Sequence, residues 1–394
     1  MKILQVNCVY GNGSTGKITS VLHKELLANE IESIVCYGRG DKTTDTNVYK
    51  ICSELYSKAN NFFSRVSGVM YGGCFNSTRR LLTLIEKEQP DLVHLQCING
   101  YFVNIYALLE YLKKNNIATV LTLHAEFMYT GGCGHAFDCE KWKDIPGCGN
   151  CSNWKMETKS VFRDRTRCMW EKMYNAFDGF ENLMVVSVSP WLMDRAKESS
   201  ILKNKKHCVI YNGLDTNIFH EYEIIGRKKK RIFHASPSFC DNPEHMKGGY
   251  YVFELARRMP EVEFFVAGPY QISGEIPQNV KMLGRISDQY ELAKYYSEAD
   301  VTLLTSKRET FSMICAESLC CGTPVIGFKA GAPEQISLSE YSEFVEYGNV
   351  DELAIVAQKW LEKSCLGDIS QKARLRYAKE TMAQNYIEVY KEMI

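Results

Sequence analysis

The chain has 394 residues, of which 45% are hydrophobic and 24% are charged, a composition ordinary for a globular protein. This length is more than one hydrophobic core usually accommodates, and it favours two domains. The chain contains 47 basic residues (Lys and Arg) and 47 acidic residues (Asp and Glu), so its formal net charge is zero. Proteins that bind nucleic acid usually carry an excess of basic residues, so this balance argues against nucleic acid as a partner.

The first residues predict a β-strand and not a signal peptide, because no long apolar run follows Lys2. No stretch approaches the length of continuous apolar residues that a membrane-spanning helix needs. We therefore expect a cytoplasmic protein, in which the 16 cysteines are mostly reduced.

Short apolar runs alternate with helical stretches in two successive series. The expected strands of the first series are Ile3–Cys8, Ile34–Tyr37, Leu92–Leu95, Thr119–Leu123, Leu183–Ser187 and His207–Tyr211, with helices at Leu81–Glu88 and Tyr106–Lys114 among them. The strands of the second are Arg231–Ala235, Glu263–Ala267, Val280–Leu283, Val301–Leu304 and Pro324–Gly327. Such runs predict parallel sheets covered on both faces, hence an α/β protein with two doubly wound, Rossmann-like halves.

The boundary between the halves is expected near residues 215–229. The turn signal Asn212-Gly213 ends the first series, and the basic run Arg227–Arg231 suits a solvated linker. We assign residues 1–215 to the first domain and 216–374 to the second. A helix at about 375–394 is expected to pack back on the first domain.

The loop Gly11–Lys17 follows the first strand and opens a helix. Glycines such as Gly13 let backbone N–H groups approach an anion at a helix N-terminus. The loop nearly matches a P-loop, but Ile18 stands where that motif needs a hydroxyl for magnesium, which argues against an NTPase. A tight turn without a ligand is the alternative.

Two carboxylates, Glu309 and Glu317, stand eight residues apart where the strand Val301–Leu304 runs into a helix. If the segment between them is helical, its rise is ~12 Å, about the span from the sugar to the ribose of a nucleotide-diphosphate sugar. The helix N-terminus between them would face the diphosphate. The alternative is a surface helix with two ordinary glutamates.

Glu309-x7-Glu317, followed by Cys-Gly-Thr-Pro-Val-Ile at Cys321–Ile326, resembles the signature of the family-4 retaining glycosyltransferases. Other segments resemble further elements of that family in the same order: Val188–Leu192, Val209–Asp215, Lys247–Gly249, Ala267–Pro269 and Ala299–Val301. Together these segments are distributed over residues 188–326.

The resemblance implies the GT-B architecture, in which two Rossmann-like domains face a cleft. The N-terminal domain would bind the acceptor, a saccharide or a lipid-linked molecule. The C-terminal domain would bind the donor, a UDP- or GDP-linked sugar. The implied reaction is a hexosyl transfer with retention, which needs no cofactor for its chemistry and serves the synthesis of a cell-surface polysaccharide such as a capsule.

The resemblance also implies roles for individual residues. Lys247 would bind the diphosphate, Glu309 the donor sugar and Glu317 the ribose. The predicted catalytic residues are Glu309, His124 and Lys247, and the predicted donor-binding residues are Gly13, Lys247, Arg285, Glu309, Thr310, Phe311 and Glu317. Thr310 and Phe311 would act through backbone N–H groups. The arginine that the family usually has before the lysine is absent, and His245 or Arg285 could replace it.

Two other functions are compatible with these residues. One is a GT-B nucleotide-sugar epimerase or hydrolase, which would release free nucleotide without an acceptor. The other is a non-catalytic sugar-nucleotide-binding subunit, against which the presence of Lys247, Glu309 and Glu317 argues.

A cysteine cluster lies in the loop 131–151, with the spacing Cys133-x5-Cys139-x8-Cys148-x2-Cys151. Four thiolates in a short loop suit a structural zinc site. A reduced loop without metal is the alternative, since disulfides are disfavoured in the cytosol. The many glycines predict that the loop has little core of its own. A similar loop occurs in a subgroup of the family associated with capsule and exopolysaccharide synthesis.

The segment Asn60–Arg80 mixes aromatic and aliphatic residues with Arg65, Arg79 and Arg80. Such a segment could rest on an anionic membrane, which would make the protein peripheral at the inner face of the membrane. An amphipathic helix that packs its apolar face on its own domain is the alternative.

Overall fold

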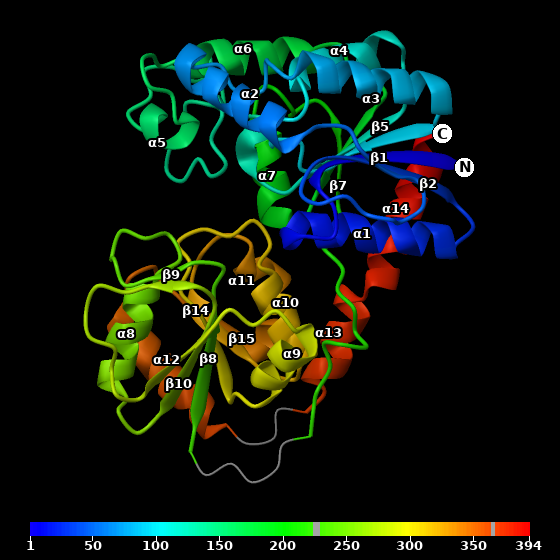
Figure 1. The fold of residues 1–394 in the computed structure, drawn as a ribbon. Coiled ribbons are helices and arrows are strands. Elements are labelled where there is room, and N and C mark those ends of the chain that lie inside the picture. Colours follow the sequence, from blue (N-terminus) through cyan, green and yellow to red (C-terminus); the bar gives the residue numbers. More distant parts are fainter. Residues whose placement is uncertain (224–228, 364–366) are drawn as a thin grey trace. The chain divides into compact units, whose positions relative to one another are not determined.

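The computed structural model describes residues 1–223, 229–363 and 367–394. These form two compact units (Figure 1). Unit 1 joins Met1–Tyr211 to Met382–Ile394, and unit 2 comprises Asn212–Thr381. The expected linker run Arg227–Arg231 lies partly outside the described residues. Within the described ranges, no helix has both the length and the apolar character needed to cross a bilayer.

Unit 1 contains a parallel seven-stranded sheet in the order β3-β2-β1-β4-β5-β6-β7. Its strands are β1 (Lys2–Val9), β2 (Glu32–Arg39), β3 (Val48–Lys50), β4 (Leu92–Leu95), β5 (Thr119–Leu123), β6 (Leu183–Ser187) and β7 (Lys206–Val209). Every residue of β4, β5 and β6 is buried, because helices cover both faces of the sheet. The sequence did not predict β3, and β7 ends before the expected Tyr211.

The helices of unit 1 form two layers. They are α1 (Gly13–Ala28), α2 (Glu54–Ser67), α3 (Phe75–Glu88), α4 (Ile105–Lys114), α5 (Trp154–Thr158), α6 (Thr166–Phe177), α7 (Pro190–Glu198) and most of α14 (Lys379–Met393), with the short 3-10 helix η1 (Glu126–Met128). Figure 1 shows α1 and α14 on one side of the sheet and α3, α4 and α6 on the other. Side chains from α1 and α14 share one core cluster with β1, β4, β5 and β6.

A buried polar network ties α14 to the sheet of unit 1. The hydroxyls of Tyr386 and Thr122 lie 2.9 Å apart, and the Tyr390 hydroxyl lies 2.7 Å from Nδ1 of His94. Nε2 of His94 lies 2.8 Å from the Thr122 hydroxyl, which closes the network. Burial lowers the pKa of His94 to about 3, so its imidazole is neutral at ordinary pH.

Unit 2 contains a parallel six-stranded sheet in the order β12-β10-β8-β13-β14-β15, and a separate pair β11-β9. Its strands are β8 (Arg231–Ala235), β9 (Phe239–Cys240), β10 (Glu263–Ala267), β11 (Tyr270–Gln271), β12 (Val280–Gly284), β13 (Val301–Leu304), β14 (Val325–Phe328) and β15 (Ser342–Val345). The sequence predicted the buried strands of the main sheet and its edge strand β12, but neither the other edge strand β15 nor the short pair.

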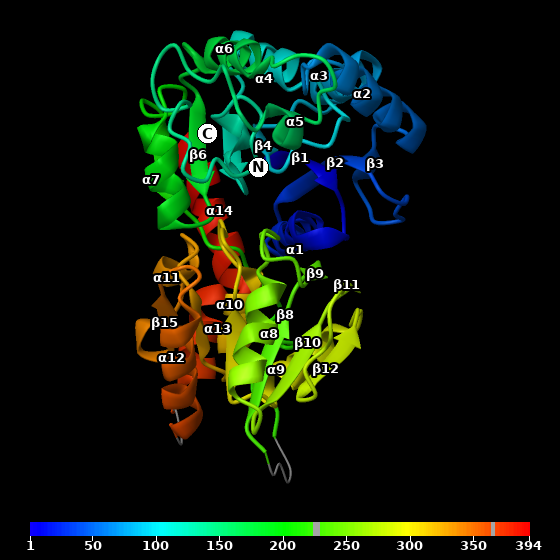
Figure 2. The same ribbon diagram turned by 90° about the vertical axis from the view of Figure 1, so that its left-hand side faces the viewer.

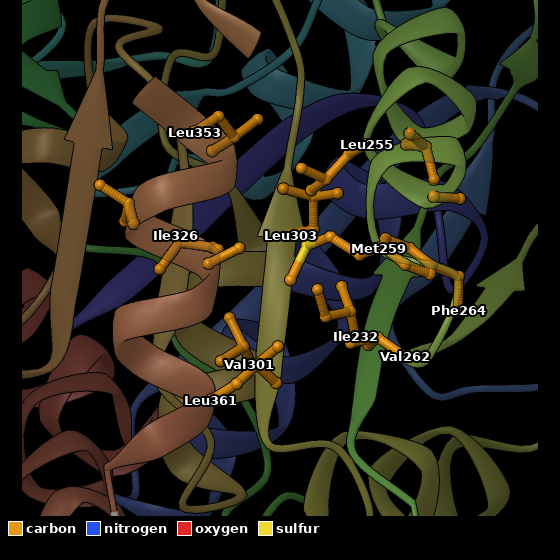
Figure 3. Packing of buried hydrophobic residues seen from close by; sticks show 14 of the residues in the cluster. Ile232, Leu255, Met259, Val262, Phe264, Val301, Leu303, Ile326, Leu353 and Leu361 are labelled. Atoms are coloured by element: carbon orange, nitrogen blue, oxygen red, sulfur yellow. The ribbon is translucent and has the colours of Figure 1, made fainter. Parts of the chain in front are cut away.

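The helices of unit 2 also form two layers. They are α8 (Gly249–Arg258), α9 (Gln289–Ser297), α10 (Met313–Cys320), α11 (Pro333–Ile336), α12 (Val350–Glu362) and α13 (Ile369–Tyr377), with the 3-10 helix η2 (Ser339–Tyr341). Figure 3 shows how Leu303 and Ile326 of the sheet meet Leu255 of α8 and Leu353 of α12 in a fully buried cluster. On the other face, α10 packs with α9 and α13. Two parallel sheets between helical layers confirm the predicted α/β, doubly wound class.

Candidate active site

Each sheet reverses its strand order at one point, between β1 and β4 in unit 1 and between β8 and β13 in unit 2. In open parallel sheets, ligands bind outside the carboxyl ends of the strands at such a point, because the loops on either side diverge there. Gly13 follows β1, whereas Glu309 follows β13. Sequence reasoning therefore placed candidate residues at both reversal points.

Lys247 and Glu309 meet at this edge of unit 2. Nζ of Lys247 lies 2.7 Å from Oε1 of Glu309, and the two side chains are 19% and 16% exposed. The next residue, Gly248, has a φ of 64°, and a Cβ there would lie 2.2 Å from the carbonyl oxygen of Thr305. The Thr305 hydroxyl in turn donates to the carbonyl of Lys247 at 3.0 Å. Glycine thus allows the two loops to approach closely enough for the ion pair to form.

The backbone of Glu309 is fixed by the loop after β14. Its N–H donates to the carbonyl of Ala330 at 2.9 Å, and its own carbonyl accepts from the N–H of Ala332 at 3.2 Å. The helix α10 begins only at Met313, after Ser312, which has a φ of 79°. The expected helix from Glu309 to Glu317 is therefore wrong in its first part, because Glu309 pairs with a neighbouring loop. The ~12 Å rise computed for a continuous helix does not apply.

A hollow of about 400 Å³ lies at the same edge of the sheet, beside the ends of β8 and β10. Arg285 and Glu317 both line it, so the structure brings these two predicted residues together. The hydroxyl of the fully buried Tyr296 donates to Oε2 of Glu317 at 3.0 Å. Burial raises the pKa of Tyr296 well above its usual value, so the hydroxyl remains a donor. The volume and the mixed lining are suited to a small ligand such as a nucleoside.

Thr310 and Phe311 lie between Glu309 and the start of α10. The ring of Phe311 is buried, and its centroid lies 6.3 Å from that of Tyr377 in an edge-to-face contact. The Phe311 side chain therefore belongs to the core, which leaves its backbone as the part that could contact a ligand.

Gly13 and His124 belong to unit 1. Gly13 is the first residue of α1 and has a φ of 64°, and the space that a Cβ would occupy there is open. His124 follows β5, and desolvation lowers its pKa to about 4. The imidazole is therefore neutral near pH 7 and can exchange hydrogen bonds without carrying charge.

The four cysteines of the loop 131–151 line one cavity of about 80 Å³. Cys148 is buried, and its sulfur accepts from the N–H of Gly131 at 3.2 Å. Burial raises the pKa of the Cys148 thiol to about 12 and also raises that of Cys133. In the residues that the structure describes, no three or more His, Cys, Asp or Glu side chains are grouped so as to hold a metal ion.

The cysteine loop has a core of its own, contrary to the expectation from its glycines. Trp142 is 1% exposed, and its ring lies under the guanidinium of Arg195 at 4.9 Å. Nε of Arg195 lies 2.6 Å from Oε1 of Glu126, which is fully buried. The other carboxylate oxygen accepts from the N–H of Ala136 at 2.7 Å. An aromatic residue and a buried ion pair thus order the loop.

Sequence reasoning missed Tyr296, Thr305 and Glu126. Tyr296 and Glu317 are 21 residues apart and meet only because α9 packs on α10. Thr305 donates its hydrogen bond to the backbone carbonyl of Lys247, and no sequence motif marks a contact of this kind. Glu126 lies two residues after the predicted His124, and an acidic residue in so apolar a segment could have indicated a buried ion pair.

Solved structures resemble the whole chain in fold. Sucrose-phosphate synthase from Thermosynechococcus elongatus has a TM-score of 0.68 at 14% identity, with 100% of this chain and 99% of that chain covered. HepE from Anabaena, solved in complex with UDP, has a TM-score of 0.65 at 16% identity, with both chains fully covered at 100%. These neighbours are GT-B glycosyltransferases, so the two units have the predicted GT-B fold.

The family profiles agree with this fold. The profile described as Glycosyltransferase Family 4 matches residues 18–218, and the profile Glycosyl transferases group 1 matches residues 244–382. The chain therefore belongs to Glycosyltransferase Family 4, and it is a glycosyltransferase. WcaC of Escherichia coli K12, provisionally named as a colanic acid biosynthesis glycosyl transferase, is 22% identical over 414 residues, with both chains covered at 100%.

Proposed function

We propose that the protein transfers a hexose from a UDP- or GDP-linked donor to a saccharide or lipid-linked acceptor, with retention of anomeric configuration. The observation that carries the proposal is the pairing of Lys247 with Glu309 at the reversal point of unit 2, on the sheet edge that also holds the Arg285–Glu317 hollow. HepE, which has the same fold, has been solved with UDP and with UDP-glucose, and this supports a nucleotide-linked donor.

The cations of unit 2 act on the leaving group. When the bond between the sugar C1 and the phosphate oxygen breaks, the nucleotide diphosphate gains negative charge, and the Lys247 ammonium stabilises that charge. Arg285 supplies a second cation in place of the arginine that the sequence lacks before Lys247. The ion pair with Glu309 holds the ammonium in position before a donor arrives.

The transfer step needs no protein nucleophile. The acceptor oxygen forms its bond to C1 on the face from which the phosphate departs, and the acceptor proton passes to a phosphate oxygen of the leaving diphosphate. Atoms and charge balance with free nucleotide diphosphate and the glycosylated acceptor as products. The proposal assigns no metal ion to this step, because Lys247 and the helix N-termini supply positive potential and the sequence has no Asp-x-Asp motif.

The remaining predicted residues bind and orient the donor. Glu317 accepts hydrogen bonds from the ribose, and Tyr296 fixes the rotamer of its carboxylate. Backbone N–H groups of Thr310 and Phe311 contact phosphate. In unit 1, neutral His124 hydrogen-bonds the donor sugar, and the turn at Gly13 presents the N-terminus of α1 to an anion.

The pathway that we propose is the biosynthesis of a cell-surface polysaccharide such as a capsule. WcaC supports this, because its name refers to colanic acid biosynthesis and it matches this chain over its full length. A Klebsiella pneumoniae protein from a cps region, 21% identical over 397 residues, supports the same assignment.

The test begins with donor binding and ends with the product. Thermal-shift screening against UDP-, GDP- and ADP-linked sugars should find one that raises Tm, and Glu317→Gln should abolish that shift. NMR of the product formed with a saccharide acceptor should show the anomeric configuration of the donor. An inverted product would refute retention. Donor consumption that yields free sugar or free nucleotide regardless of acceptor would favour the epimerase or hydrolase.

A further inference from the structure

The helix α2 is oriented with its polar side toward the protein. Its buried residues are Ser57 and Ser64, which are 2% and 6% exposed and lie two helical turns apart on one face. On the opposite face Leu55, Phe62 and Val66 are 80%, 63% and 43% exposed. A helix on the surface of a globular protein normally turns its apolar face to the core, and here that face points to solvent.

Small polar contacts hold α2 in this orientation. The Ser57 hydroxyl donates to the carbonyl of Gly100 at 3.1 Å, and Oδ1 of Asn60 accepts from the N–H of Cys74 at 2.8 Å. The orientation is therefore built by specific hydrogen bonds to neighbouring segments. The sequence left open whether the apolar residues of segment 60–80 pack on their own domain: Met70 does, at 6% exposed, whereas Phe62 and Phe63 of α2, at 63% and 65%, do not.

Apolar side chains from two other segments extend this face. Phe75, at the start of α3, is 70% exposed, and the N–H of the next residue, Asn76, donates to the Tyr56 hydroxyl of α2. Val161 and Phe162 are 56% and 69% exposed, and the N–H of Val161 donates to the carbonyl of Arg65 at the end of α2. Figure 2 shows α2 and α3 together at the periphery of unit 1. Exposed apolar side chains that gather in this way mark an interaction surface.

The charges around the apolar face are mostly basic. Residues 54–80 contain four basic residues (Lys58, Arg65, Arg79 and Arg80) and one acidic residue, Glu54. Glu54 already pairs with Lys50 at 3.2 Å and Arg39 at 3.6 Å. Within the described part of the chain, none of those four basic residues forms an ion pair.

A basic hollow adjoins α3. It has a volume of about 480 Å³ and is lined by Arg79, Arg80 and Lys87 together with Asn76. The two guanidinium groups and the ammonium, which also lies 3.5 Å from Glu88, give this hollow a positive charge that suits an anionic group such as phosphate.

We propose that α2, Phe75 and the Val161–Phe162 turn form a surface that docks on an anionic lipid bilayer, which we call the α2 face. Leu55, Phe62, Phe63 and Val66 insert among the acyl chains at the boundary of the headgroup layer. Arg79, Arg80 and Lys87 bind lipid phosphates. Helices that bind at the surface of a membrane typically have an exposed apolar face flanked by basic residues. The proposal concerns where the protein works, and it does not depend on the transfer reaction.

Vesicle cosedimentation of the full chain, without donor or acceptor, tests the proposal. The wild type should bind vesicles of phosphatidylglycerol and phosphatidylcholine in equal parts, and bind phosphatidylcholine alone far more weakly. Phe62→Ser with Phe63→Ser should weaken binding at least roughly tenfold, because two aromatic side chains no longer insert. Arg79→Gln with Arg80→Gln should weaken it about 25-fold, at about fivefold per charge, and should reduce its salt dependence.

Matched variants in unit 2 control for a general loss of apolar or basic surface. Ile355 and Leu375 are 70% and 73% exposed, and the pair Ile355→Ser with Leu375→Ser should leave vesicle binding unchanged. Lys281→Gln with Lys294→Gln is the corresponding control for charge. A wild type that does not bind, or Phe62 and Phe63 variants that bind normally, would overturn the proposal. So would a wild-type dimer in light scattering that these variants convert to a monomer, since a second copy would then cover the face.

Discussion

Replacing Lys247 with alanine tests the central contact of the proposed site. The change removes the ammonium that lies 2.7 Å from Glu309 but keeps the carbonyl of residue 247 that accepts from Thr305. The loop should therefore retain its position. If the ammonium contacts the leaving diphosphate, its loss removes a charge-assisted interaction of about 1.5–3 kcal/mol. The value of kcat/KM should then fall roughly 10- to 150-fold.

The same change should lower the stability of the fold by a limited amount. Both side chains are largely buried, at 19% and 16% exposed, and the change leaves the Glu309 carboxylate without its cation, so stability should fall by about 1–3 kcal/mol. At about 2–4 °C per kcal/mol, Tm should fall by no more than about 12 °C. Initial rates of nucleotide release and thermal unfolding, measured on the same preparation, separate the two effects. Lys281→Ala, a change of an exposed lysine in the same unit, is the control and should alter neither.

Two results would refute the reasoning. A folded Lys247→Ala protein with normal donor kinetics would show that the ammonium does not act on the leaving group. A fall in Tm far beyond the expected range would show instead that the ion pair is chiefly structural. Any loss of activity would then have to be attributed to misfolding.

Three further predictions concern metals and pH. Brief treatment with EDTA should leave initial rates intact, and a strict requirement for Mg²⁺ or Mn²⁺ would contradict the proposed transfer step. If the four cysteines hold a structural zinc site, elemental analysis of protein purified without chelator should find about one zinc per chain, and the Cys148→Ser variant should lose it. A negligible metal content, together with an unchanged Tm in Cys148→Ser, would show that the loop is reduced and binds no metal. His94 is neutral in the fold with a pKa of about 3, against 6.5 when unfolded, so the unfolded state binds more protons between these values. The lowered pKa of His94 therefore adds to the free energy of unfolding, and this contribution is fully present above pH 6.5. Below pH 6.5 it should fall by about 1.4 kcal/mol per pH unit. His94→Asn should reduce the slope of urea unfolding free energy from pH 7 to 5 by that amount, while His124, whose pKa is lowered to about 4, keeps its own contribution.

The sequence predicted the buried strands well because they are continuous apolar runs between turn signals. β5 and β13 have the bounds that were expected. The edge strands β3 and β15 were missed because they are short and carry half-exposed polar residues, and so lack the apolar run of a buried strand. Strand prediction from hydrophobic runs thus works best where a strand is buried on both faces.

The sequence predicted the residues of the candidate site only where they belong to a local motif. That motif contains Glu309 and Glu317. The structure also shows contacts between residues far apart in the sequence, such as the hydrogen bond from the Tyr296 hydroxyl to Glu317, which a local motif cannot predict. The orientation of α2 was unpredictable for a related reason. Its alternation of apolar and polar residues fixes two faces, but hydrogen bonds to distant segments, from Ser57 to Gly100 and from Cys74 to Asn60, decide which face turns inward.

The return of α14 to unit 1 has a consequence for how the protein is made. Unit 1 is discontinuous in sequence, because Met382–Ile394 complete a core that begins at Met1. On the ribosome, the sheet of unit 1 is synthesised long before Tyr386 and Tyr390 exist to cover His94 and Thr122. At about 5–20 residues per second, unit 1 waits on the order of ten seconds or more while unit 2 is translated. During that time its buried polar groups face water, so unit 2 can fold first although it is made second. A chain truncated directly after unit 2 would leave that side of the sheet covered by α1 without α14.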